Sequence, residues 1–76
     1  MDVKTLNEIL EAVDPIGIAW FAPNEYDPEA RDISERLKVR TNTQQVVVEV
    51  FEQWFHPGCI TEDQAKAIAE AIEKAK

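Results

Sequence analysis

The run Val46-Val47-Val48-Glu49-Val50-Phe51 decides the fold class of this chain, because its residues are compatible with two kinds of secondary structure. β-Branched residues favour strands. The positions Val47, Val50, Phe51 and Trp54, however, recur at the spacing of one helical face. A lone strand would find no second strand to pair with elsewhere in the chain. We therefore predict a helix here and an all-α fold.

The residues on both sides of this run support a helix there, and those that follow it begin a further helix. Residues 41–45, Thr-Asn-Thr-Gln-Gln, offer several capping side chains before the run, and His56-Pro57-Gly58 ends it. A complete helix start follows, with Thr61 as the cap and Gln64 as its capping-box partner. The apolar face expected for this last helix consists of Ala65, Ile68, Ala69, Ile72 and Ala75.

A first helix is predicted at the amino-terminal end. Its cap is either Asp2, or Thr5 with Glu8 in a capping box, and Pro15 stops it at Asp14. Its apolar face consists of Val3, Leu6, Ile9, Leu10 and Val13.

A second helix is expected to begin at Asp27-Pro28-Glu29. Its apolar face is narrow, and Asp32 and Arg36 lie one turn apart in the favourable order for an ion pair. Asn42 either closes this helix or caps the next one. The predicted fold is a small four-helix bundle, with three long helices and one shorter, that forms one domain over residues 1–76.

Two Asp-Pro pairs flank the long connection between the first two helices. In Asp14-Pro15 and in Asp27-Pro28 a side-chain acceptor precedes a residue whose φ is fixed near the helical value. This is the arrangement expected of an N-cap followed by the first helical residue. Asp14, Asp27 and Thr61 are therefore predicted to be structural caps.

Composition indicates a globular protein, and the cysteine content together with the amino-terminal sequence leads us to expect a cytoplasmic one. Of the 76 residues 45% are hydrophobic, which is enough for a core. The single cysteine, Cys59, cannot form an internal disulfide, and the chain does not open with a secretion signal. The longest nearly uncharged apolar window, Pro15–Pro23, is too short to span a bilayer, so no membrane association is expected.

The net charge of −7 bears on the class of partner. Like charge repels the phosphate backbone, so nucleic acid is disfavoured. The excess of acids serves either solubility or attraction to a basic protein, and charge alone does not separate these two explanations.

Neither of the two groups of metal-binding residue types makes a complete site. The acids between Glu25 and Asp32 suggest a calcium loop, but Ala30 stands where that loop needs glycine and Arg36 where it needs glutamate. His56 and Cys59 supply two ligands, whereas a structural zinc site needs four. We expect no metal, no cofactor and no catalytic residue.

Aromatic residues in the connection between the first two helices are the candidate recognition surface. Trp20, Phe21 and Tyr26 either fold back onto the core or form an exposed patch beside Glu25 and Asp27. If they are exposed, these five residues are the predicted partner-binding site.

Three short blocks resemble the YugE-like family of small uncharacterised bacterial proteins. They are residues 14–17, Asp-Pro-Ile-Gly; residues 26–29, Tyr-Asp-Pro-Glu, followed by Asp32-Ile33; and the aromatic segment 51–55 that leads through Ile60-Thr61 into the last helix. Val13 departs from the tryptophan typical of that family. The resemblance implies an all-helical cytosolic domain and supplies no activity and no catalytic residue.

Three functions remain open at this point. The leading hypothesis is a non-enzymatic module that holds a protein partner through the segment 15–32 and the adjoining helix face. An immunity- or antitoxin-like inhibitor of a basic toxin is the alternative within the same class. A small-ligand or metal-binding protein is the alternative from another class, although a core this small leaves little room for a pocket.

Overall fold

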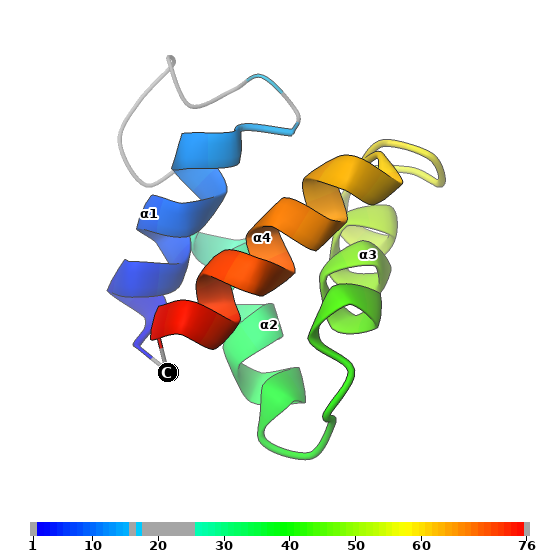
Figure 1. The fold of residues 1–76 in the computed structure, drawn as a ribbon. Coiled ribbons are helices and arrows are strands. Elements are labelled where there is room, and N and C mark those ends of the chain that lie inside the picture. The colour runs from blue at the N-terminus through cyan, green and yellow to red at the C-terminus, as the bar shows by residue number, and fades with distance from the viewer. Residues whose placement is uncertain (1, 16, 18–25, 76) are drawn as a thin grey trace.

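The computed structural model describes residues 2–15, 17 and 26–75, and these form four helices. They are α1 (Val3–Val13), α2 (Asp27–Leu37), α3 (Thr43–Trp54) and α4 (Glu62–Ala75) (Figure 1). The described residues contain no strand. The all-α prediction is confirmed, and the valine-rich run lies entirely within α3.

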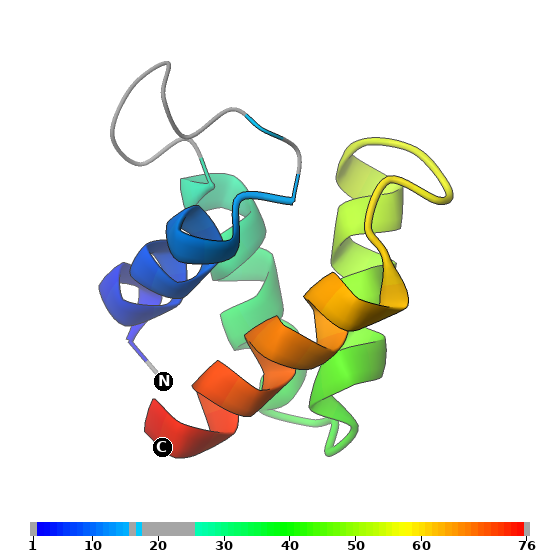
Figure 2. The ribbon, with the colours of Figure 1, turned by 45° about the horizontal axis from the view of Figure 1, so that its top comes forward.

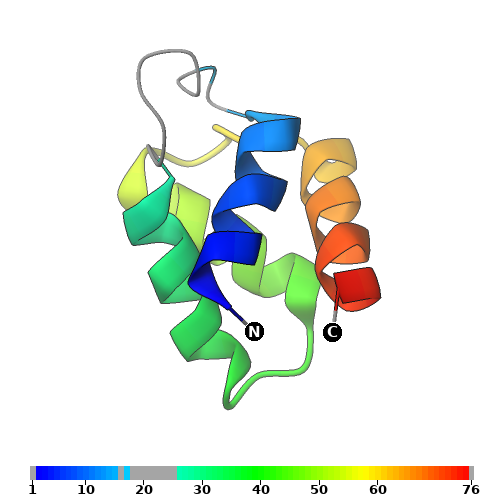
Figure 3. The ribbon, with the colours of Figure 1, turned by 90° about the vertical axis from the view of Figure 1, so that its left-hand side faces the viewer.

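The helices pack as a ring in chain order, in which each helix contacts its two neighbours. The contacting pairs are α1 with α2, α2 with α3, α3 with α4, and α4 with α1. The chain therefore returns to its starting point, so that the beginning of α1 lies beside the end of α4 (Figures 2 and 3). These two helices run antiparallel, and their shared edge closes the ring.

The core fills the middle of the ring, and α3 supplies much of it. Val46, Val47, Val50 and Phe51 are completely buried. Burying such side chains contributes about 1.5–3 kcal/mol each, which outweighs the preference of β-branched residues for strands, a preference that spans about 1 kcal/mol. Tertiary burial thus determines the helical state of this run. The other fully buried apolar residues are Leu6, Leu10, Tyr26, Ala30, Ile33, Ala65, Ile68 and Ile72.

Three helix starts carry the side-chain caps expected of their sequences. The Oγ1 of Thr61 accepts from the Gln64 backbone N–H at 3.1 Å, and the Gln64 Oε1 accepts from the Thr61 N–H at 3.0 Å. This reciprocal pair is the predicted capping box. Asn42 caps α3 by accepting from the Gln45 N–H, and Asp2 caps α1 by accepting from the Lys4 N–H.

Of the other two predicted caps, Asp14 is a cap but at the opposite end of a helix from the one expected, and Asp27 is not a cap. Asp14 is not an N-cap: it ends α1, in the left-handed conformation with φ 49° and ψ 58°, and its backbone N–H donates to the Leu10 carbonyl. An aspartate tolerates this conformation better than most side chains do. Asp27 is the first residue of α2 rather than its cap, because Tyr26 holds the cap position without a side-chain hydrogen bond. The carboxylate of Asp27 instead binds Arg31 Nε at 3.0 Å, one turn along the helix.

In the described part of the chain, the helices are too short or too polar to cross a membrane.

Candidate functional site

The predicted partner-binding residues have different positions in the structure. Trp20, Phe21 and Glu25 lie outside the described residues. Asp27 lies at the surface, with a little over a third of its side chain exposed. Tyr26 is completely buried, so it follows the alternative in which an aromatic residue folds onto the core, and it is not part of an exposed recognition surface.

Tyr26 is a core residue that also connects two helix ends. Its ring meets Phe51 edge to face, with centroids 5.9 Å apart and an interplanar angle of 71°. Its hydroxyl donates to Asp14 Oδ1 at 2.6 Å. This bond joins the end of α1 to the start of α2 across twelve positions of sequence. A bond this short to a carboxylate is a strong, charge-assisted interaction, so Tyr26 and Asp14 together hold the end of α1 against the start of α2.

Among residues 2–15, 17 and 26–75, Trp54 at the end of α3 is the large aromatic side chain that is exposed. Half of its surface is accessible, although it shares a helical face with the buried Val50. Its indole Nε1–H donates to Asp32 Oδ2 on α2 at 3.2 Å. The helical spacing placed Trp54 on the same face of α3 as Val50, and at this end of the face the indole meets the carboxylate of Asp32. The end of this helical face at Trp54 is therefore half-exposed, whereas Val47, Val50 and Phe51 on the same face are buried.

A network of ion pairs between α2 and α3 holds Asp32 in place. Arg36 donates to both carboxylate oxygens of Asp32, from Nε at 2.9 Å and from Nη2 at 3.3 Å. Arg36 also reaches Glu49 Oε1 at 3.4 Å and the Oε1 of Gln53. The predicted Asp32–Arg36 pair is confirmed, and it forms part of a larger network than the sequence indicated.

Arg40 completes the network on the side away from Trp54. It binds both carboxylate oxygens of Glu49, at 2.8 and 2.9 Å. The hydrogen bond from Arg40 lowers the pKa of Glu49, and the charges of Arg40 and Arg36 act in the same direction. The same hydrogen bond raises the pKa of Arg40. Both groups are therefore charged at neutral pH, and the network joins α2 to α3 electrostatically.

Asp32, Gln53 and Trp54 line a surface hollow of about 450 Å³ between α2 and α3, which we call the Trp54 hollow. The indole presents an apolar wall, while the carboxylate and the amide present polar ones. Tryptophan dominates the binding energy of many protein interfaces, because it combines a large apolar surface with a hydrogen-bond donor. The hydrogen bond to Asp32 restrains the ring, and a restrained side chain loses less entropy in a complex than a freely rotating one.

The other candidate chemical groups have structural partners. Cys59 is half-buried, packs against the core, and its Sγ–H donates to the Phe51 carbonyl at 3.4 Å. His56 is exposed and its Nδ1 lies 3.0 Å from the Pro57 carbonyl oxygen. No group of three or more His, Cys, Asp or Glu side chains within residues 2–15, 17 and 26–75 is placed to hold a metal ion.

The sequence carries one signal that points to Trp54. It stands one turn beyond the last buried valine of its face, directly before the segment Phe55-His56-Pro57 that ends the helix. A large side chain in the last turn has fewer neighbours along the axis than one in the middle of a helix. A position near the helix end therefore permits exposure, but it does not identify the site by itself, because Tyr26 at the start of α2 is buried.

Comparisons with protein-family models, with curated proteins and with solved structures found no match to this chain. The resemblance to the YugE-like family accordingly stays a prediction.

Proposed function

We propose that this protein is a non-enzymatic interaction domain that binds another protein through the Trp54 hollow. The observation that carries the proposal is the half-exposed Trp54, held by a hydrogen bond from its indole to Asp32. The half-exposed indole offers a large apolar surface to a partner, and tryptophan is enriched among the residues that dominate the binding energy of interfaces. Partner binding would remove the indole from water while leaving its hydrogen bond in place.

The ion-pair network supports this function by making the hollow rigid. Asp32 is bound by Arg36 and Trp54 together, and Arg36 in turn contacts the carboxylate of Glu49 on α3. A binding site built on two packed helices and supported by such contacts changes little when the partner arrives. We expect rigid docking, with most of the affinity contributed by the indole.

The charge of the whole molecule favours a basic partner. A net charge of −7 attracts a positively charged protein at long range and raises its association rate. An immunity- or antitoxin-like complex with a basic enzyme would use this attraction. The network around Trp54 pairs acids with arginines, so the steering comes from the molecular surface as a whole rather than from the hollow itself.

Comparative affinity capture from the source cells tests the proposal. The wild-type chain, Trp54→Ala and Val39→Ala are used as baits. Val39 is the matched control, because it is 85% exposed and belongs to the connection between α2 and α3. We expect a protein that is retained by the wild type and by Val39→Ala and is depleted more than about tenfold by Trp54→Ala, as for the loss of a hot spot. Equal retention by all three folded baits would refute the proposal.

A further inference from the structure

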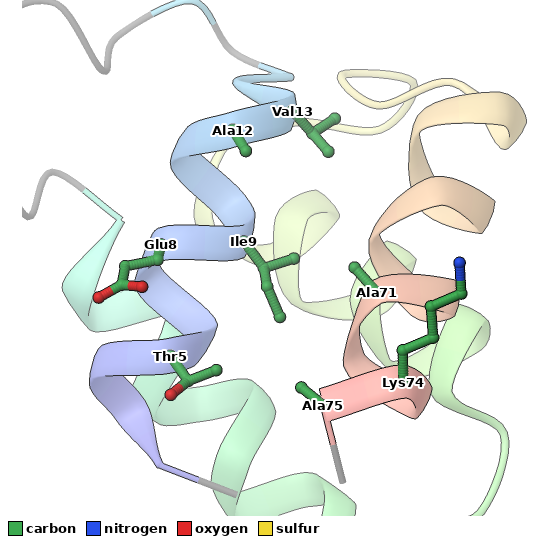
Figure 4. Close-up of a pocket in the computed structure, with 8 residues that line it drawn as sticks. All are labelled: Thr5, Glu8, Ile9, Ala12, Val13, Ala71, Lys74 and Ala75. Atoms are coloured by element: carbon green, nitrogen blue, oxygen red, sulfur yellow. The ribbon is translucent and has the colours of Figure 1, made fainter.

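A second surface, on the opposite pair of helices, has the features of an interface between two copies of this chain. Along the edge where α1 and α4 pack antiparallel, their side chains bound a groove of about 460 Å³, which we call the α1–α4 groove (Figure 4). It lies at the closure of the helical ring, whereas the Trp54 hollow lies between α2 and α3.

The two walls of the α1–α4 groove differ in side-chain size. The α1 wall contributes the branched side chains of Ile9 and Val13, which pack only partly into the core. The α4 wall contributes the methyl groups of Ala71 and Ala75. The side chains of the α1 wall are therefore larger than those of the α4 wall, as Figure 4 shows for Ile9 and Ala71.

The two walls also differ in charge. Glu8, on α1, and Lys74, on α4, are both exposed and extend on opposite sides of the groove (Figure 4). They are the charged residues of its lining, which is therefore neutral in a chain with a net charge of −7. A neutral lining gives a strongly basic partner little to bind, and a surface with one acidic and one basic rim can pair with itself.

We propose that the α1–α4 groove binds the same groove of a second copy, around a two-fold axis that runs along it. That axis places α1 of each copy over α4 of the other. The branched side chains of Ile9 and Val13 then face the alanines of the second copy, and Glu8 faces Lys74 of the second copy. Because the contact is isologous, every pairing occurs twice.

The net negative charge of both copies opposes this association without preventing it. Mobile ions screen the repulsion between charges that lie more than about 8 Å apart at physiological salt. Glu8 and the second copy's lysine would be in direct contact, and their attraction is screened less once the groove closes. The dissociation constant of the dimer should therefore be higher at very low ionic strength than at physiological ionic strength.

Sedimentation equilibrium over micromolar to millimolar protein concentrations measures this association directly. The wild type should dimerise. Glu8→Lys and Lys74→Glu should each raise the dimer dissociation constant by about tenfold or more, because each reversal replaces two attractions by two repulsions. The double variant, Glu8→Lys with Lys74→Glu, should recover the wild-type value to within about threefold. Both residues are exposed, so the variants should keep their circular dichroism spectra.

Two controls separate the paired contact from general charge effects. Glu8→Lys makes the chain less negative and Lys74→Glu makes it more negative, so repulsion between net charges alone would shift the two constants in opposite directions. Glu35→Lys changes the net charge as Glu8→Lys does, at an exposed position of α2, and should not weaken the dimer. Ala12→Arg places a long charged side chain in the groove and should abolish dimerisation.

A monomer at every concentration would overturn the inference, as would a dimer that both single reversals leave intact or that the double reversal fails to restore. None of these results bears on Trp54, because the two surfaces share no residue.

Discussion

Removing the hydroxyl of Tyr26 tests how the two ends of the connection between α1 and α2 are fixed. In Tyr26→Phe the ring stays against Phe51, and the change is confined to the 2.6 Å bond to Asp14. A hydrogen bond to a charged group contributes about 1.5–3 kcal/mol. Asp14 is only partly buried, so water can replace the lost donor, and we expect a loss near the lower limit, about 1.5 kcal/mol.

A loss of this size is readily measured in so small a domain. The whole free energy of unfolding should be about 4–11 kcal/mol at 0.05–0.15 kcal/mol per residue. The melting temperature of Tyr26→Phe should fall by about 6–12 °C. Urea denaturation followed by circular dichroism gives the free energy of unfolding. The slope of this free energy against urea concentration should not change, because the substitution leaves the compactness of the folded state unchanged.

As a control, the effect of Tyr26→Phe is measured again in a chain that carries Asp14→Gly. Asp14 has a positive φ, which glycine adopts freely, so this substitution removes the acceptor without straining the backbone. In that background Tyr26→Phe should cost less than about 0.5 kcal/mol. An equal cost with and without the Asp14 carboxylate, or a cost below about 0.5 kcal/mol in the wild type, would refute the argument.

Three further outcomes are expected. Asp27→Ala should lower the free energy of unfolding, measured by urea denaturation, by only about 0.3–0.5 kcal/mol, because Asp27 forms a surface ion pair with Arg31 and is not a cap. A decrease near 1 kcal/mol would instead indicate that Asp27 acts as a helix cap. Because the pKa of Glu49 is lowered in the folded state, the unfolded chain binds more protons than the folded chain at acid pH. The Glu49 carboxylate therefore stabilises the fold above about pH 4, and this stabilisation is lost as the pH falls further. Glu49→Gln should therefore flatten the decline of stability between about pH 5 and pH 3, and an unchanged decline would contradict the role of Arg40. The purified protein should hold no stoichiometric metal and keep its melting temperature in chelator, whereas elemental analysis showing zinc that disappears in Cys59→Ser would make His56 and Cys59 a site.

The sequence predicted the helices well because their signals are local. The capping box of Thr61 and Gln64 depends on groups three residues apart, and the valine-rich run could be assigned once the lack of a second strand was considered. The two Asp-Pro pairs were harder, because the same dipeptide permits opposite roles. Asp14 follows a helix and turns left-handed at its end, while Asp27 already lies inside α2.

The candidate site could not be predicted from the sequence, because contacts between helices determine it. Tyr26 and Trp54 are both large aromatic residues next to a helix end. Tyr26 is buried because Phe51 and Asp14 meet its ring and its hydroxyl. Trp54 is half-exposed because Asp32 meets its indole at the surface. None of these three neighbours is local in sequence, so periodicity alone could not distinguish the two roles.

Site-specific photo-crosslinking in the source cells tests the binding role of the Trp54 hollow most directly. A photoreactive residue at position 53, which lines the hollow, is compared with the same residue at position 39, the exposed control. We predict one discrete adduct with another protein from position 53 and none from position 39. Adding Trp54→Ala to the position 53 chain should reduce the adduct more than about tenfold. An adduct that survives the loss of Trp54, or equal labelling from both positions, would contradict the proposed function.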